Sequence, residues 1–211
     1  MLFFSLIFLL FLAYMFSYVD RQILSILFEP IKAELLLSDT QLGFLGGIAF
    51  ALTYSILGVP LAMLADRKGR KSIITASLAI FSAMTVCCGM AANFVQMAIA
   101  RVGVGVGEAG INPASQSIIA DIYPRDKRST PMSLVALGAP MGMLVGLVGG
   151  GMVADNFGWR AAFYVVGLPG VLLAVIMWFT MREPERGKAD AREQSMEDAP
   201  RLLDAMKYMW R

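Results

Sequence analysis

The chain has 211 residues, of which 57% are hydrophobic and 16% are charged, whereas roughly a quarter of an average soluble domain is charged. A soluble domain of this length needs more polar side chains to cover its surface, so the composition indicates a protein surrounded by lipid. The net charge of only +2 gives no reason to expect a nucleic-acid partner. The chain has no histidine, and because histidine is the usual general base and the commonest metal ligand, we expect no metal, cofactor or enzyme activity.

Six uncharged or nearly uncharged stretches are long enough to cross a bilayer, which requires about 20 apolar residues in a helix. In chain order they cover about residues 2–28, 40–65, 72–92, 94–120, 132–154 and 161–181. The uncharged stretch 72–100 is too long for one crossing, so we expect the third helix to end and the fourth to begin near Asn93. The sequence therefore predicts an all-α membrane protein with six transmembrane helices.

Lysine and arginine residues are distributed unequally between the predicted loops. The loop after the second helix has four, the loop after the fourth has three and the tail after residue 181 has seven, whereas the opposite side has only Lys32 and Arg160. Loops rich in these residues face the cytoplasm. We therefore expect a multi-pass protein of the plasma membrane or the bacterial inner membrane, with both termini cytoplasmic.

Two loops share a sequence pattern although they are predicted to lie on opposite sides of the membrane. Residues 63–71 and 152–160 both contain Met, an aliphatic residue, Ala, Asp, two variable residues, Gly, one variable residue and a base. This is what an inverted repeat of three plus three helices produces, as in many secondary transporters. The alternative is a chance match, since Asp and Gly are common in tight loops.

Small residues recur every four positions on two predicted helices, which favours close helix packing in lipid. They are Gly138, Gly142, Gly146 and Gly150 on the fifth helix, and Gly43, Gly47, Ala51 and Ser55 on the second.

Residues 105–110 match the GxGxxG dinucleotide pattern, but that pattern requires a preceding strand. We therefore interpret its glycines as points where a neighbouring helix approaches. Pro140 and Pro169 are expected to kink the fifth and sixth helices.

Four ionisable residues lie inside the predicted helices: Asp20, Arg21, Arg101 and Glu108. Such residues are unfavourable in lipid unless they are paired or face water, and they are functional by default. Arg101 and Glu108 are seven positions apart and so share one helix face. All four are predicted near the middle of the membrane, which is where a transporter binds its cargo and its proton.

We therefore expect Asp20 and Glu108 to couple transport to protons. Arg21, Arg101 and Glu108 are the expected substrate-binding residues, with the arginines neutralising the carboxylates in one state and binding an anionic group in another. Permanent salt bridges between the first and fourth helices are the structural alternative.

Other classes of function predict different patterns. A passive channel would have a continuous polar stripe, whereas the charges here cluster at one level. A membrane-embedded enzyme would need a nucleophile with its base, and no such arrangement is recognisable. A receptor that descends from a carrier but transports nothing remains open, and a flux assay with and without a proton gradient separates it from a transporter.

These residues resemble the major facilitator superfamily. Its loop pattern Gly-x-x-x-Asp-Arg-x-Gly-Arg-Lys is matched by residues 62–71, with Ala62 in place of the first glycine, and Arg101, Gly105 and Gly107 resemble its fourth-helix element. The resemblance implies that an inner gate is held by the loop residues Asp66, Arg67, Gly69, Arg70 and Lys71.

Within that superfamily the chain resembles most the spinster-like lipid transporters. The similar segments are residues 18–21, 105–109, 119–121 and 125–129. The resemblance implies proton-coupled secondary active transport of an amphiphilic anionic lipid, of lysolipid or sphingosine 1-phosphate type, by alternating access. Related symporters carry a similar Asp-Arg pair, so an organic anion or a drug is the alternative substrate.

The superfamily has twelve helices in two halves, so six helices imply one half of a twelve-helix major facilitator fold. We expect residues 1–181 to form the N-terminal bundle, 182–200 a cytoplasmic linker, and 201–211 the start of an amphipathic cytoplasmic helix leading to a C-terminal half. The implied partners are the lipid bilayer, the substrate, protons and that C-terminal half.

Overall fold

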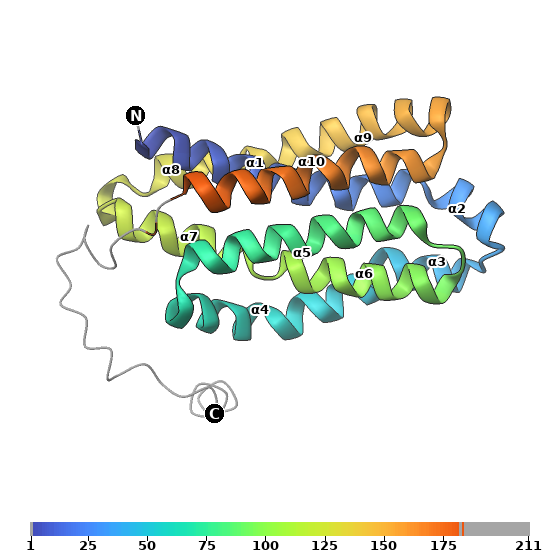
Figure 1. Ribbon diagram of the computed structural model, residues 1–211, viewed down its shortest axis with the longest axis horizontal. Helices are drawn as coiled ribbons and strands as arrows, with labels where there is room; N and C mark the ends of the chain where they lie inside the picture. The colour runs from blue at the N-terminus through green and yellow to red at the C-terminus, as the bar shows by residue number, and fades with distance from the viewer. Residues whose placement is uncertain (1, 182, 184–211) are drawn as a thin grey trace.

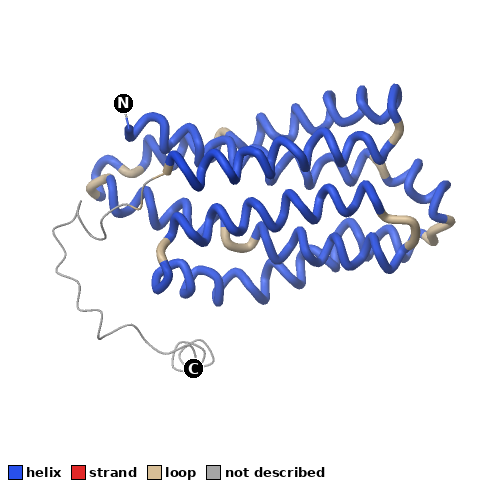
Figure 2. The backbone as a smooth tube through the Cα atoms, in the orientation of Figure 1, coloured by secondary structure: helices blue, strands red, loops and turns tan. Residues whose placement is uncertain are grey.

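The computed structural model describes residues 2–181 and Glu183, and most of them lie in helices that run side by side along one axis (Figures 1 and 2). The helices are α1 (Leu2–Ile26), α2 (Phe28–Leu35), α3 (Asp39–Gly43), the π-helix η1 (Phe44–Ile48), α4 (Ala49–Lys68), α5 (Arg70–Met90), α6 (Phe94–Glu108), α7 (Ile111–Ile122), the 3-10 helix η2 (Arg125–Lys127), α8 (Ser129–Ala136), α9 (Gly138–Phe157) and α10 (Trp159–Thr180). No strand occurs among these described residues, so the predicted all-α class is confirmed.

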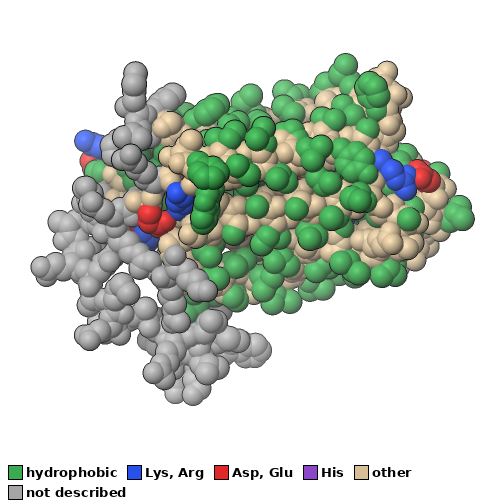
Figure 3. Space-filling model, viewed as in Figure 1, with side chains coloured by type: hydrophobic (Ala, Val, Ile, Leu, Met, Phe, Trp, Pro, Cys, Tyr) green, Lys and Arg blue, Asp and Glu red, His purple; other side chains and the backbone are tan. Residues whose placement is uncertain are grey.

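Six helical segments in the described part of the chain are long and apolar enough to cross a membrane. They are Ser5–Ile26, Asp39–Ala65, Arg70–Met90, Phe94–Ile122, Arg125–Phe157 and Trp159–Thr180. Hydrophobic side chains cover the middle of the visible face, and the coloured charged groups lie toward its two ends (Figure 3). The predicted six transmembrane helices are therefore confirmed, as expected for a bundle solvated by lipid.

Polar caps divide the long uncharged stretch into the third and fourth spans. The Asn93 side chain accepts a hydrogen bond from the Gln96 amide at 3.0 Å, and the Gln96 side chain accepts one from the Ala92 amide at 2.8 Å. These bonds satisfy amide groups that a helix start leaves unpaired. The predicted boundary near Asn93 is confirmed.

The two loops with a shared sequence pattern also share a backbone conformation. Gly69 and Gly158 have φ angles of 99° and 84°, a region that side chains with a Cβ atom rarely enter, and the next helix begins at the following residue in both cases. The loops lie at opposite ends of the bundle, and α5 and α10, the helices that follow them, pack along each other (Figure 1). These features fit the predicted inverted three-plus-three repeat.

Glycines bring helix backbones together at the centre of the bundle. The buried glycines of α9 face α1, where a Cβ atom on Gly142 would lie 2.9 Å from the Tyr18 Cβ atom. On α6, a Cβ atom on Gly105 would lie 3.2 Å from the Phe50 carbonyl oxygen, and one on Gly107 would lie 2.6 Å from the Phe81 Cβ atom. The interpretation of the α6 and α9 glycines as contact points is therefore confirmed. The stripe on the second span does not pack in this way, because Gly43, Gly47, Ala51 and Ser55 are exposed and a Cβ atom on either glycine would meet nothing within 4 Å among the described residues.

Two of the membrane spans are interrupted near a proline. The fourth span breaks between α6 and α7 at Ala109 and Gly110, and the fifth breaks between α8 and α9 at Leu137. Pro113 and Pro140 follow these breaks, and each lacks the amide hydrogen that would bind the carbonyl four residues earlier. The break before Pro140 agrees with the kink expected in the fifth helix, whereas no break was expected before Pro113. In the sixth helix, α10 stays helical through Pro169.

Polar contacts join the loops at the end of the bundle where α9 meets α10. The Trp159 indole donates a hydrogen bond to the Glu34 carboxylate at 2.6 Å, and Arg160 forms an ion pair with the same carboxylate. These donors hold the pKa of Glu34 below its ordinary value. Arg160 also donates to the Ala91 carbonyl oxygen at 3.0 Å, so α2, the α5–α6 loop and α10 are tied together.

The start of α1 and the end of α10 lie at the same end of the bundle (Figure 1), as an even number of spans requires. The assignment of that end to the cytoplasm stays a prediction. The predicted linker 182–200 and the predicted helix 201–211 lie outside the described residues, apart from Glu183.

The packing of α9 on α1 predicts that Gly142→Ala lowers stability. The added methyl group would press on the α1 backbone, and overpacking of this kind costs about 1–3 kcal/mol. Gly151→Ala is the matched control, because a Cβ atom there meets nothing within 4 Å. Thermal unfolding in detergent should show a lower midpoint for Gly142→Ala only; equal midpoints for both variants would contradict the packing.

Candidate functional site

The four charged residues predicted in the membrane form two ion pairs, each of which joins α1 to α6. The Arg21 guanidinium lies 2.8 Å from the Glu108 carboxylate (Nη2 to Oε2), with a second contact from Nε at 2.9 Å. The Arg101 guanidinium lies 2.8 Å from the Asp20 carboxylate (Nη1 to Oδ2). The structure therefore brings together all four residues, but as two pairs in different surroundings.

The Asp20–Arg101 pair is enclosed by protein. The Asp20 side chain is fully buried and that of Arg101 is 2% exposed. Thr85 on α5 donates a hydrogen bond to the second Asp20 oxygen at 2.7 Å. The pair consequently connects α1, α5 and α6, and neither residue lines the polar pocket beside Glu108.

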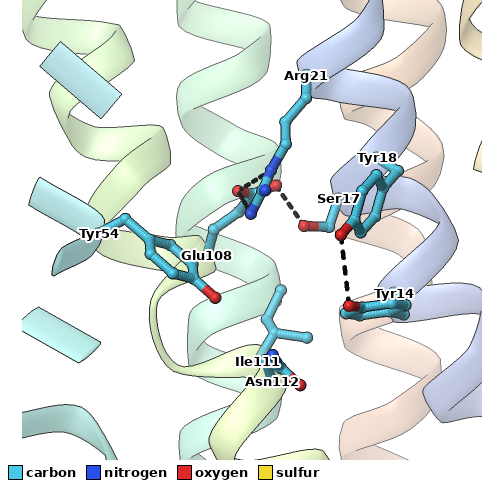
Figure 4. A pocket seen from close by; sticks show the side chains of 8 residues that line it. All are labelled: Tyr14, Ser17, Tyr18, Arg21, Tyr54, Glu108, Ile111 and Asn112. Atoms are coloured by element: carbon cyan, nitrogen blue, oxygen red, sulfur yellow. Dashed lines mark hydrogen bonds and ion pairs between the residues drawn. The ribbon is translucent and has the colours of Figure 1, made fainter. Parts of the chain in front are cut away.

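The Arg21–Glu108 pair lies on the wall of a polar pocket (Figure 4). The pocket has a volume of about 60 Å³, which is roughly the space of two waters. Its lining residues are Tyr14, Ser17, Tyr18, Arg21, Tyr54, Glu108, Ile111 and Asn112. The Ser17 hydroxyl also donates to Glu108, whose side chain is fully buried, whereas that of Arg21 is 34% exposed. Arg21 is therefore the more accessible member of the pair.

Aromatic rings hold the Arg21 guanidinium independently of Glu108. Its central carbon lies 4.6 Å from the ring centroid of Phe50, 5.1 Å from that of Tyr18 and 5.3 Å from that of Tyr54. Cation–π attraction of this kind is worth about 0.5–2 kcal/mol per contact. The rings come from α1 and α4, so two helices contact the guanidinium in addition to Glu108.

Glu108 is the last residue of α6, directly before the break at Ala109 and Gly110. Interrupted helices surround the substrate sites of many membrane transporters, because unwound backbone is tolerated where it lines a cavity. The nearly uncharged stretch 94–120 predicted a continuous helix here. Gly110 and Pro113 were the available signal for the break.

The predicted gate residues lie at the end of the bundle that contains the α4–α5 loop. The Glu183 carboxylate accepts hydrogen bonds from the backbone amides of Arg70 at 2.7 Å and Lys71 at 2.9 Å, so it caps α5. Arg70 forms an ion pair with Asp121 on α7. The side chains of Asp66 and Arg67 lie outside the described residues, and the gating role of the loop stays a prediction.

Several pocket residues were not predicted as functional. Tyr14, Ser17 and Tyr18 lie on the same face of α1 as the predicted Arg21, because positions 14 and 18 and positions 17 and 21 are four apart, so a polar stripe on an otherwise apolar helix was visible in the sequence. Phe50, Tyr54 and Asn112 come from other helices, and only the fold brings them to Arg21 or to the pocket.

The described residues contain no group of three or more His, Cys, Asp or Glu side chains placed to hold a metal ion. The pocket chemistry is that of one carboxylate, one guanidinium, hydroxyl groups and an amide. Such groups can bind an anionic or hydroxylated molecule and can take up or release a proton.

Comparisons with known proteins agree with this fold. The chain is 34% identical over 194 residues to an MFS-type efflux pump of Mycolicibacterium smegmatis, and the aligned region covers 92% of this chain and 43% of the pump. It is 33% identical over 187 residues to a probable L-galactonate transporter of Escherichia coli, covering 89% of this chain and 41% of that protein.

A solved structure is also similar. It is the crystal structure of a bacterial homolog of the human lysosomal transporter Spinster, in an inward-facing and occupied conformation, with a TM-score of 0.84 and 37% sequence identity. The match covers 90% of this chain and 46% of that one. The chain thus spans less than half of the length of each of these relatives.

A family model described as Major Facilitator Superfamily matches residues 10–211. This match covers almost the whole chain and agrees with the six spans and the inverted repeat. The protein is an integral multi-pass membrane protein, and the chain belongs to the Major Facilitator Superfamily.

Proposed function

We propose that this chain is the N-terminal half of a proton-coupled secondary active transporter of an amphiphilic anionic substrate, of lysolipid or sphingosine 1-phosphate type, which works by alternating access. The observation that carries the proposal is the Arg21–Glu108 pair on the wall of the polar pocket. The choice of substrate class rests on the resemblance to the spinster-like lipid transporters, and the similarity to the bacterial Spinster homolog agrees with that resemblance.

Competition for Arg21 couples the proton to the substrate. A charge within the membrane is stabilised by a partner of opposite charge, so the Arg21 guanidinium pairs either with the Glu108 carboxylate or with an anionic group of the substrate. Protonation removes the negative charge of Glu108 and releases Arg21, which Tyr18, Phe50 and Tyr54 keep in place. Loss of the proton restores the ion pair and displaces the substrate.

Arg21 suits this exchange because its side chain is partly exposed while that of Glu108 is enclosed. A substrate can therefore reach the guanidinium without first displacing the carboxylate from its Ser17 hydrogen bond. The guanidinium can bind a phosphate or a carboxylate through two parallel hydrogen bonds. The tyrosines of the pocket offer apolar surface beside these polar groups.

A second candidate is transport of a small organic anion. The observation that favours it is the similarity to a probable L-galactonate transporter, because a sugar acid carries a carboxylate but no apolar chain. Uptake of a sugar acid and of a lysolipid by the same vesicles distinguishes the two candidates. A receptor that transports nothing would give no flux of either.

Glu108→Gln tests the coupling role. The amide cannot release a proton or carry a charge, so we expect proton-driven substrate accumulation in reconstituted vesicles to be abolished, while exchange without a gradient persists. Asn112→Ala, at another pocket residue, is the control for a general disturbance of the pocket. Undiminished accumulation by Glu108→Gln would remove this residue from the coupling role.

Arg21→Lys and Arg21→Ala test substrate binding. Lysine keeps the charge but loses the planar pair of donors, so we expect about tenfold weaker binding, equivalent to ~1.4 kcal/mol. Alanine also leaves Glu108 without its cation, and we expect no measurable transport. Unchanged affinity in Arg21→Lys, measured by tryptophan quenching or calorimetry, would argue against direct contact with the substrate.

For Asp20 and Arg101 the enclosed geometry favours a positioning role over direct contact with the substrate. We expect Asp20→Asn to lower the free energy of unfolding by ~3–5 kcal/mol, because it leaves the buried Arg101 charge unpaired. Replacing both residues by apolar ones, as in Asp20→Leu with Arg101→Met, should recover most of this loss. If that stable double variant transports without proton coupling, Asp20 is a proton carrier as well.

A further inference from the structure

An apolar crevice separates α9 from α10, with α1 at its base. Its volume is about 240 Å³, which exceeds the ~150 Å³ that holds a benzene molecule in an engineered protein cavity. Val145, Gly149 and Val153 line it on α9, and Val165 and Pro169 line it on α10. Every lining residue is apolar or glycine, so water has no hydrogen-bond partner among these side chains and an apolar occupant is favoured.

The crevice lies on the side of α1 that faces away from the polar pocket. Tyr14, Ser17, Tyr18 and Arg21 line the pocket, whereas Met15, Phe16, Val19 and Ile23 line the crevice. At about 100° per residue, the two sets are centred roughly 160° apart on the helix. A second half that completes the polar pocket would therefore leave the crevice uncovered.

The borders of the crevice belong to the surface that contacts lipid. Val148 on α9 is 52% exposed, and Val165 and Leu168 on α10 are 55% and 58% exposed. Hydrophobic side chains also cover the middle of the visible face of the molecule (Figure 3). The crevice is thus an inward extension of the surface around which acyl chains pack.

The depth of the crevice matches one leaflet of the bilayer. Its lining residues on α9 and α10 lie between about 6 and 20 Å from the α9–α10 loop along the helices, at 1.5 Å per residue. Half of the hydrocarbon core is about 15 Å thick. The long dimension of the crevice therefore follows the direction in which an acyl chain extends.

The size of the crevice selects its occupant. A volume of about 240 Å³ spread over ~14 Å along the helices gives a mean cross-section of roughly 17 Å², whereas a helix about 10 Å across has a cross-section of roughly 80 Å². The crevice therefore fits a single hydrocarbon chain and not a helix of a second copy. At Gly149 a Cβ atom would meet nothing within 4 Å, so this side of α9 is open to the crevice. An empty crevice would forfeit dispersion contacts along its walls.

We propose that this crevice is a binding site for one acyl chain of a bilayer phospholipid from the leaflet next to the α9–α10 loop. The chain packs between α9 and α10 against the apolar face of α1. This site goes beyond the transport function and does not depend on the identity of the substrate. Its occupant supports the helix that presents Ser17 and Arg21 on the opposite face.

Photolabelling tests the site. The full-length protein is reconstituted in phosphatidylethanolamine and phosphatidylglycerol vesicles that contain a phospholipid with a diazirine group on its acyl chain, then irradiated and mapped by mass spectrometry. We expect labels on residues 145–153 and 162–169 to be several-fold more abundant than on exposed residues of other spans at the same depth.

Gly149→Leu should fill the crevice and lower this labelling several-fold. Gly151→Leu is the matched control, since it adds the same side chain to the same helix outside the crevice, where a Cβ atom also meets nothing within 4 Å. Labelling in the control should equal that of the unaltered protein. Val165→Phe, at the border of the crevice, gives a second test if Gly149→Leu does not fold.

Even labelling of all exposed apolar residues at that depth would overturn the proposal. So would labelling that is unchanged in a folded Gly149→Leu or Val165→Phe variant. Labelling that is lost as the protein-to-lipid ratio rises would also overturn it, because a second copy that displaces the lipid would then be the preferred occupant.

Discussion

A charge inside a membrane is unfavourable unless it is paired or faces water, and this constraint organises the bundle. Asp20 and Arg21 are adjacent on α1, so their side chains leave the helix about 100° apart and cannot share one partner position. Arg101 and Glu108 on α6 supply one partner to each. Since both pairs cross between the same two helices, they fix α1 and α6 in rotation and in register.

The two pairs have similar chemistry but different surroundings. Asp20 and Arg101 are enclosed by α5, with Thr85 as an additional donor, so that pair favours rigidity. Arg21 and Glu108 border a pocket, and aromatic rings contact the Arg21 guanidinium in addition to its carboxylate partner. A site that exchanges ligands needs this second arrangement, because the cation must stay in place while its partner changes.

Close packing around α1 determines what its other faces can do. The glycines of α9 bring that helix against the α1 backbone, whereas the apolar crevice lies between α9 and α10. One helix therefore contacts the polar pocket on one face, a tight helix interface on another and an apolar crevice on a third. A change at any of these three faces therefore affects the helix that carries Asp20 and Arg21.

The sequence alone determined the six spans, the Asn93 boundary, the inverted repeat and the four charges in the membrane, because burial in lipid imposes apolar length and makes each charge conspicuous. Tertiary structure alone decided that these charges form two separate pairs and that the Phe50 and Tyr54 rings contact Arg21. Periodicity places a side chain on a face of its own helix but does not say which neighbour that face meets. The packing of α1 on α9, together with side-chain contacts from α1 to α4, α5 and α6, supplied that choice of neighbours, and with it the difference between an enclosed pair and an accessible one.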